Sequence, residues 1–334
     1  MNSMPMSLAV LPIEGVNWLC STRGECVKLR AKAPGAADAR YTIAPDSSML
    51  AVLDSNSKRA GLFRILAEEP WLERVLPFAN LPKRCVGHAL AVVGDNLLVG
   101  GEAKTSEALW MRTAGSDGPW RAIPLPAEIA LPGKAIDGLL LDGNRLIAVD
   151  NFVLPKWVLV YAAEGPGELR QTDAIELRSH TSYERVCATA WGRPGAALLS
   201  QGINHGVFSV YLSVLDANTL QEIAVWSSHS LGHAGHTQKP VGGPLLGARD
   251  IAFVGDQLLV ACGEDGLLRI DLGTWRPGSS KEPAPVFEPA PGLVRVDRIV
   301  VPTPSLEAGA FAVGLVANGD LAATWVEIGS ALGG

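Results

Sequence analysis

The segment Leu90-Ala-Val-Val-Gly-Asp-Asn-Leu-Leu-Val99 joins two short apolar runs through a polar turn. Gly, Asp and Asn tolerate the positive φ of a tight turn, so the segment is typical of a β-hairpin. The same pattern recurs at Leu139-Leu-Leu-Asp-Gly-Asn-Arg-Leu-Ile-Ala-Val149 and at Ile251-Ala-Phe-Val-Gly-Asp-Gln-Leu-Leu-Val260. The sequence therefore predicts one antiparallel unit that is repeated along the chain.

Weaker copies of this hairpin fill most of the remaining sequence. They lie at 8–20, 41–52, 186–199 and 299–316. A third apolar run follows each of the better copies, at 61–65, 108–112, 156–161, 207–211, 267–270 and 321–325. More polar runs at 174–177 and 222–226 are typical of exposed outer edge strands. The repeat length is roughly 45–60 residues, which is in the range of propeller blades.

These repeats predict an all-β fold, a single β-propeller domain over residues 1–334 with four-stranded antiparallel blades. Seven blades are favoured and six are the alternative. The first and last copies look short of strands, so we expect strands from the N- and C-termini to close the ring.

Two segments also resemble WD40 or YVTN-type propeller repeats. Ala44-Pro-Asp-Ser-Ser-Met-Leu-Ala-Val-Leu-Asp54 followed by Gly61-Leu-Phe-Arg-Ile65 is similar to such a repeat. Gly87 and His88 resemble the WD40 Gly-His pair, with Trp110 near the family's tryptophan position. The Trp-Asp signature is missing from every copy, so the resemblance implies the fold and no subfamily.

Composition narrows the class of protein. The chain has 334 residues, a net charge of −6 and no cluster of Lys and Arg, which predicts no nucleic-acid partner. We expect neither a signal peptide nor a membrane span, because no apolar run approaches the length that either needs. Most of the five cysteines (Cys20, Cys26, Cys85, Cys187 and Cys262) are expected to be buried free thiols. A Cys20–Cys26 disulfide across a hairpin is the less favoured alternative. This cysteine usage predicts a cytoplasmic location.

Ionisable residues recur where each predicted inner strand begins: Arg40, His88, Asp137, Arg185, Asp250 and Arg298. Glu184, Arg249 and Asp297 lie beside them. Inner strands of a propeller start at the mouth of the central channel, so these side chains are expected to form a ring there. Two interpretations are open: a polar binding pocket, or acid–arginine pairs that neutralise one another between blades. The alternating signs favour the second.

A second recurring set of acidic residues follows the second strand of the repeat: Asp54, Glu102, Asp150, Glu264 and Asp265. The set is compatible with an acidic face for a cationic partner or Ca²⁺. It is also typical of carboxylates that hydrogen-bond the turn, which is the favoured interpretation.

The segment 227–239 contains His229, His233 and His236, half of the six histidines in the chain. Three imidazoles suit a zinc ion, but the glycines between them argue against a helix that would align them. They are therefore weak metal candidates, and the sequence predicts no metal and no cofactor. No nucleophile elbow, P-loop, dinucleotide fingerprint or HExxH motif is present.

With no catalytic motif, the favoured function is a non-enzymatic scaffold that docks a protein partner in a multi-protein assembly through its top face. The alternative is a hydrolase that resembles the propeller lactonases and sugar hydrolases. In that case His88, Asp137, Arg185, Asp250 and Arg298 supply acid–base and oxyanion groups.

Overall fold

The structure is a computed structural model. It describes residues 7–13, 16–21, 26–29, 39–54, 58–66, 72–82, 85–102, 107–114, 118–127, 135–150, 155–165, 167–177, 184–204, 207–231, 245–273, 275, 283, 285–303 and 309–328. Regular structure in these residues is entirely β-strand. The strands form seven antiparallel sheets, each built from consecutive strands. The prediction of a seven-bladed propeller is therefore confirmed, and the six-bladed alternative is wrong.

The first three blades contain eleven strands: β1 (Leu8–Ile13), β2 (Val16–Ser21), β3 (Cys26–Lys28); β4 (Arg40–Ile43), β5 (Met49–Leu53), β6 (Arg59–Ile65), β7 (Leu72–Asn80); β8 (Val86–Val93), β9 (Asn96–Glu102), β10 (Leu109–Thr113), β11 (Arg121–Ala122). The fourth and fifth blades contain β12 (Ile136–Asp142), β13 (Arg145–Asp150), β14 (Lys156–Gly165), β15 (Glu168–Leu177); β16 (Glu184–Gly192), β17 (Gly195–Asn204), β18 (Val207–Asp216), β19 (Glu222–Leu231). The last two contain β20 (Asp250–Val254), β21 (Gln257–Ala261), β22 (Leu267–Asp271), β23 (Val286–Glu288); β24 (Arg295–Val300), β25 (Gly309–Leu315), β26 (Leu321–Glu327).

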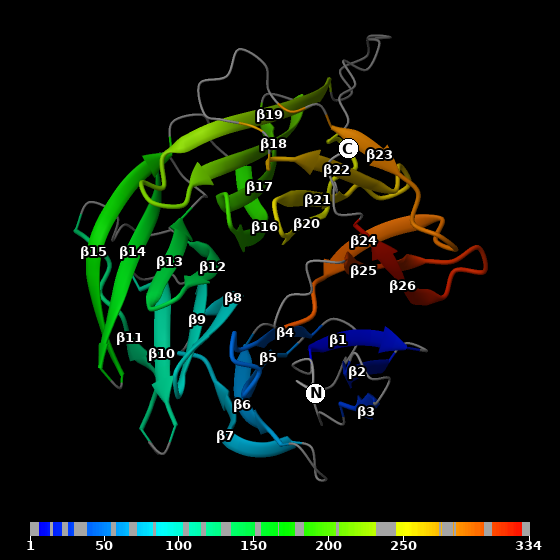
Figure 1. Cartoon of the computed structure of the whole chain (residues 1–334). Helices are drawn as coiled ribbons and strands as arrows, with labels where there is room; N and C mark the ends of the chain where they lie inside the picture. The colour runs from blue at the N-terminus through cyan, green and yellow to red at the C-terminus, as the bar shows by residue number, and fades with distance from the viewer. Residues whose placement is uncertain are drawn as a thin grey trace, which may run out of the picture.

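The blades stand around a common centre, with the first strand of each blade innermost (Figure 1). The strongest predicted hairpins pair as expected, for example Val93 with Asn96 and Val254 with Gln257. Their turns contain Gly94 and Gly255 at φ of 54° and 59°, the left-handed region that favours glycine. The five middle blades have four strands and the first and last have three.

The ring closes where the first and last blades meet. Leu8 and Thr303 exchange two backbone hydrogen bonds, of 2.8 and 2.7 Å. Strand β1 also lies against β26. In the described part of the chain, strands from both termini therefore meet at the closure as two neighbouring sheets, not as one shared sheet.

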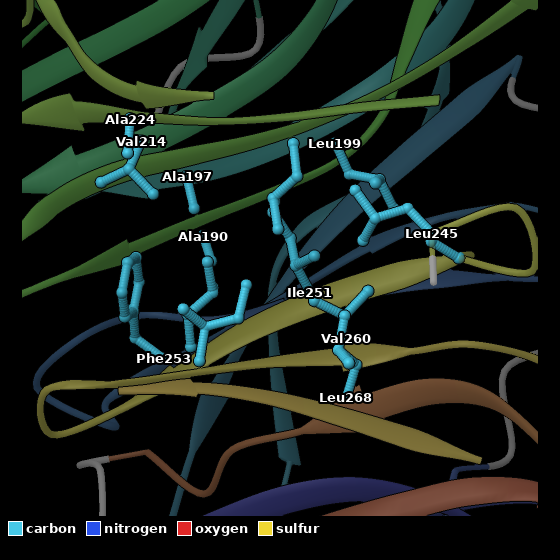
Figure 2. Packing of buried hydrophobic residues seen from close by; sticks show 14 of the residues in the cluster. Ala190, Ala197, Leu199, Val214, Ala224, Leu245, Ile251, Phe253, Val260 and Leu268 are labelled. Atoms are coloured by element: carbon cyan, nitrogen blue, oxygen red, sulfur yellow. The ribbon is translucent and has the colours of Figure 1, made fainter. Parts of the chain in front are cut away.

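Apolar contacts between neighbouring blades form the core. The described residues contain seven buried clusters, and each one spans a different pair of adjacent blades. The largest joins the fifth and sixth blades, where Phe253 and Ile251 of β20 face Ala190 and Val214 (Figure 2). A Cβ added to Gly192 would lie 2.4 Å from the ring of Phe253, so the two blades approach closely here because Gly192 has no side chain.

One sequence prediction about cysteine is wrong. Cys20 and Cys26 form a disulfide, because they pair directly across β2 and β3 with their Cα atoms 4.1 Å apart. Cys85 and Cys262 are buried and form no disulfide, as predicted, whereas Cys187 also forms none but has exposed surface.

The structure has no helix long and apolar enough to cross a membrane among the residues that it describes.

The contact between Gly192 and Phe253 gives a direct test of the packing between blades. We expect Gly192→Val to lower the free energy of unfolding by about 1–3 kcal/mol, because the new side chain overlaps the Phe253 ring. Urea denaturation measures the loss. The matched control is Gly165→Val, because a Cβ at Gly165 meets only the end of the Glu168 side chain, at 3.6 Å. Equal losses in both variants would contradict the packing.

Candidate functional site at the channel mouth

The inner strands of all seven blades line one cavity of about 540 Å³, and β4, β8, β12, β16, β20 and β24 do so with residues close to their starts. Five of the six predicted ring residues line it: Arg40, His88, Asp137, Asp250 and Arg298. Arg249, Asp297 and Cys187 line it as well. The cavity is therefore lined by residues of all seven blades at one end of the channel.

Four of these inner strands carry a β-bulge close to their first residue. The bulges lie between Gly87 and Ala89, Ile136 and Gly138, Val186 and Ala188, and Val296 and Arg298. The residue inside each bulge is His88, Asp137, Cys187 or Asp297, and all four line the cavity. A bulge inserts an unpaired residue and re-aims its side chain. The fold thus uses the same local irregularity four times to point a side chain into the channel.

The bulge in β16 separates Arg185 from the predicted ring. Cys187 occupies the bulge, and Arg185 lies two residues earlier, outside the lining of the cavity. The Arg185 Nη2 atom is 2.9 Å from Glu102 Oε2, and the same oxygen is 3.9 Å from His88 Nε2. Arg185 therefore lies beside the site, and Glu102 lies between it and His88. Sequence reasoning missed Cys187 as a lining residue, because one inserted residue does not disturb the apolar pattern of the repeat.

The two carboxyl groups of the cavity have raised pKa values. Burial raises the pKa of Asp137 to about 7, against the opposing effect of the Arg185 guanidinium. Asp137 Oδ2 is buried and has no hydrogen-bond partner among the described residues. Burial raises the pKa of Asp250 to about 6, although the Ile299 N–H donates a 2.9 Å hydrogen bond to its Oδ2. Near neutral pH, both carboxyl groups therefore hold a proton more readily than a solvated Asp does.

Two arginines face these carboxyl groups. Burial and the neighbouring Arg298 lower the pKa of Arg40, whereas Asp137 and Asp250 both raise it, so Arg40 interacts with all three groups. The Arg40 Nη1 donates a hydrogen bond to the carbonyl of His88. Arg298 is exposed and has no ion pair within 4 Å in the described part of the chain. Arg298 is thus open to an anionic group that enters from the mouth.

Burial, followed by the nearby Arg185 and Arg40, lowers the pKa of His88. Its imidazole is therefore neutral at pH 7. Its Nε2 atom is buried without a hydrogen-bond partner among the described residues. A buried polar atom without a hydrogen-bond partner costs free energy. A ligand whose polar group forms a hydrogen bond with this Nε2 atom would remove that cost.

Cys187 has exposed surface within the channel, but the surrounding walls screen it from bulk water. Burial, with a smaller effect of Asp250, raises the pKa of its thiol to about 12. The thiol lies 3.3 Å from the carbonyl of Leu199, to which it donates a hydrogen bond. It stays protonated at neutral pH and is not a nucleophile.

The predicted acidic set does not form one surface. Asp54 is 2% exposed and accepts hydrogen bonds from the backbone of Lys58 and Arg59, and its carboxylate also pairs with the Arg59 side chain. Asp150 is wholly buried at the end of β13. Glu264 and Asp265 are exposed in the turn after β21. Asp54 therefore stabilises its own turn instead of serving a ligand.

The histidine segment lies mostly outside the described residues, which do not include His233 or His236. His229 belongs to β19, opposite Ser209, but its side chain is not described. The described residues contain no group of three metal-binding side chains. The prediction that the protein binds no metal, with these three histidines as weak candidates, therefore stays a prediction.

The raised pKa of Asp137 can be tested through stability. Its native pKa of about 7 exceeds the usual Asp value of 3.8, so the native state holds the proton more tightly, and wild-type stability falls as the pH rises from about 4 to 7. We expect Asp137→Asn to be more stable than wild type at pH 8 by roughly 1–3 kcal/mol, with nearly equal stability at pH 4. Urea denaturation at both pH values measures this. The control is Asp173→Asn on the exposed edge of β15, and parallel pH curves for wild type and Asp137→Asn would contradict the assignment.

Comparison with protein-family models and with curated proteins gives no match to this sequence. Solved structures match over most of the chain. A putative 6-phosphogluconolactonase from Bacteroides uniformis is 14% identical with a TM-score of 0.56, covering 97% of this chain and 96% of its own. Another from Bacteroides fragilis is 14% identical with a TM-score of 0.54, covering 97% and 95%. BamB from Moraxella catarrhalis is 11% identical with a TM-score of 0.49, covering 96% and 79%. At these identities the likeness shows the β-propeller fold alone.

Proposed function

We propose that the channel mouth is an acid–base site that hydrolyses lactones or esters. The observation that carries the proposal is the meeting of Asp137 and Asp250, with pKa values raised to about 7 and about 6, beside Arg40 in one cavity. Buried titratable groups with strongly shifted pKa values that gather in one cavity are a mark of candidate acid–base sites. The sequence favoured docking over catalysis; this pair of carboxyl groups reverses the preference.

The two carboxyl groups suit opposite roles in the reaction. The Asp250 carboxylate takes a proton from a water molecule, whose oxygen then bonds to the substrate carbonyl carbon. Arg40 and Arg298 stabilise the oxyanion. The carbon–oxygen bond of the ester then breaks, and protonated Asp137 gives its proton to the departing alkoxide. The products are a carboxylic acid and a hydroxyl group, joined in one molecule when the substrate is a lactone.

This division of roles predicts a narrow bell-shaped pH profile. Activity needs Asp250 ionised and Asp137 protonated, so kcat/KM should rise as the pH passes about 6 and fall as it passes about 7. A pH-indicator assay over a panel of γ- and δ-lactones measures it. We expect Asp250→Asn to lower kcat by about 10²–10⁴-fold. The matched control is Asp173→Asn, outside the cavity. Hydrolysis that survives unchanged in Asp250→Asn, or no hydrolysis across the panel, would refute the proposal.

A second proposal concerns the face of the propeller that contains the channel mouth, and it keeps the docking role that the sequence favoured. Three apolar side chains are exposed there: Val86 (37%) at the start of β8, Ile203 (65%) near the end of β17 and Val294 (56%) just before β24. Exposed apolar side chains of this kind favour contact with a protein partner. Under this proposal the ring is a subunit of a larger assembly, and the charged mouth grips a partner side chain.

Docking predicts that Ile203→Asp removes a partner without unfolding the ring. Tagged wild type and variant are compared in pull-downs from the native lysate at equal amounts, with circular dichroism as the check on folding. We expect one stoichiometric protein with wild type and its loss with Ile203→Asp. The exposed control Val286→Asp lies on the outer strand β23 and should keep it. Equal recovery with all three proteins would contradict docking at this face.

The cytoplasmic location stays a prediction. The Cys20–Cys26 disulfide weighs against it, because structural disulfides are typical of oxidising compartments.

A further inference from the structure

The channel continues beyond its charged mouth into a second cavity of about 650 Å³. The two cavities share lining residues from several inner strands, among them Thr42, Leu139 and Thr189. Several inner strands therefore line the charged cavity near their first residues and the second cavity farther along the strand. At a rise of ~3.3 Å per residue, the stretch of β12 from Asp137 to Leu141 spans roughly 13 Å of channel.

The second cavity is lined mostly by apolar residues, and polar atoms form the rest of its surface. Fourteen of its twenty lining residues are Ala, Val, Leu, Ile, Pro, Phe or Trp, and Arg193 is the one charged side chain in this lining. Leu140, Trp191 and Phe253 come from three different blades and line it together. Cavities of this size with mainly apolar walls and a few polar groups are typical of small-molecule sites. Transfer of a hydrocarbon chain from water into such walls is favourable by about 0.8 kcal/mol per CH₂ group that is buried.

The charged cavity determines the chemical class of ligand that can fill both cavities. Arg40 and the exposed Arg298 offer charge-assisted hydrogen bonds, and a planar guanidinium matches a carboxylate well. His88 Nε2 and Asp137 Oδ2 are buried polar atoms without partners among the described residues. A ligand that fills both cavities thus needs an oxygen-rich, anionic head and a hydrocarbon body. A purely apolar ligand would leave the mouth unpaired.

We propose that the channel binds an amphiphile whose carboxylate lies between Arg40 and Arg298 and whose hydrocarbon chain occupies the apolar cavity lined by Trp191. The inference deepens the proposed hydrolysis and rests on it for the substrate class: a lactone or ester that carries a hydrocarbon chain, with the carboxylate as its product.

Tryptophan fluorescence tests the binding without any need for turnover. Trp191 is the one tryptophan that lines either cavity, and bromine quenches an indole that it contacts. The probe is 11-bromoundecanoate, whose bromine would lie at the apolar end. We expect saturable quenching with wild type, competition by dodecanoate, and loss of most of the quenching in Trp191→Phe. Quenching that is not saturable, or that is unchanged in Trp191→Phe, would overturn the proposal.

Two further variants test separately where the carboxylate and the hydrocarbon chain of the ligand bind. We expect Arg298→Gln to weaken binding of the bromo-acid about 10-fold and to leave binding of neutral 11-bromoundecanol within about 2-fold. Thr42→Phe should narrow the shared middle of the channel and weaken both probes, whereas the size-matched control Thr42→Val should not. Equal weakening of acid and alcohol by Arg298→Gln would overturn the assignment of the carboxylate to this end.

Binding and hydrolysis fail in distinguishable ways. Hydrolysis of short lactones without quenching by the bromo-acid would refute the amphiphile and leave the proposed function standing. Quenching without hydrolysis of any lactone, including lactones with a hydrocarbon chain, would support amphiphile binding and refute the reaction together with the substrate class drawn from it.

Discussion

Every blade of this ring buries both faces of its sheet only when another blade stands on either side of it. Seven apolar clusters, one for each pair of neighbours, meet this requirement in the described residues. Each cluster is shared by two neighbouring sheets, and no blade buries its apolar residues alone. The stability of the protein therefore depends on the completed ring of blades. The circle also fixes where the inner strands stand. All seven line the charged end of a central channel, and residues of six blades also line its other end, where most lining residues are apolar.

The rigid ring of inner strands holds the charged side chains at the channel mouth in place. Buried carboxyl groups with raised pKa values cost stability at neutral pH, and a ring that needed only to fold would gain from losing them. Asp137 and Asp250 are kept beside arginines instead, and His88 and Asp137 present atoms without partners in the described structure. This combination is typical of a site built for a ligand or a reaction. It differs from Asp54, whose carboxylate is fully used by its own turn.

Most of the fold was predictable because the hairpin repeats carry strong local information. The turns at Gly94 and Gly255 need residues that tolerate positive φ, and such turns are visible in a sequence. The bulges are not, because an extra residue at the start of an apolar strand leaves its later alternation intact. Arg185 was therefore expected in the ring where the structure places Cys187. The disulfide was undervalued for a related reason: direct pairing of Cys20 with Cys26 depends on a register that spacing alone does not determine.

The closure between the first and last blades has a consequence for how the protein is made. Its cluster contains four buried residues, Ala9, Leu11, Cys20 and Val313, which is the smallest of the seven in the described residues. Leu8 leaves the ribosome before its backbone partner Thr303, and the strands of five blades lie between them in the sequence. During synthesis one apolar side of the first blade therefore stays uncovered until the seventh blade has been made. A nascent ring of this kind is vulnerable to pairing with the wrong neighbour until its final blade arrives.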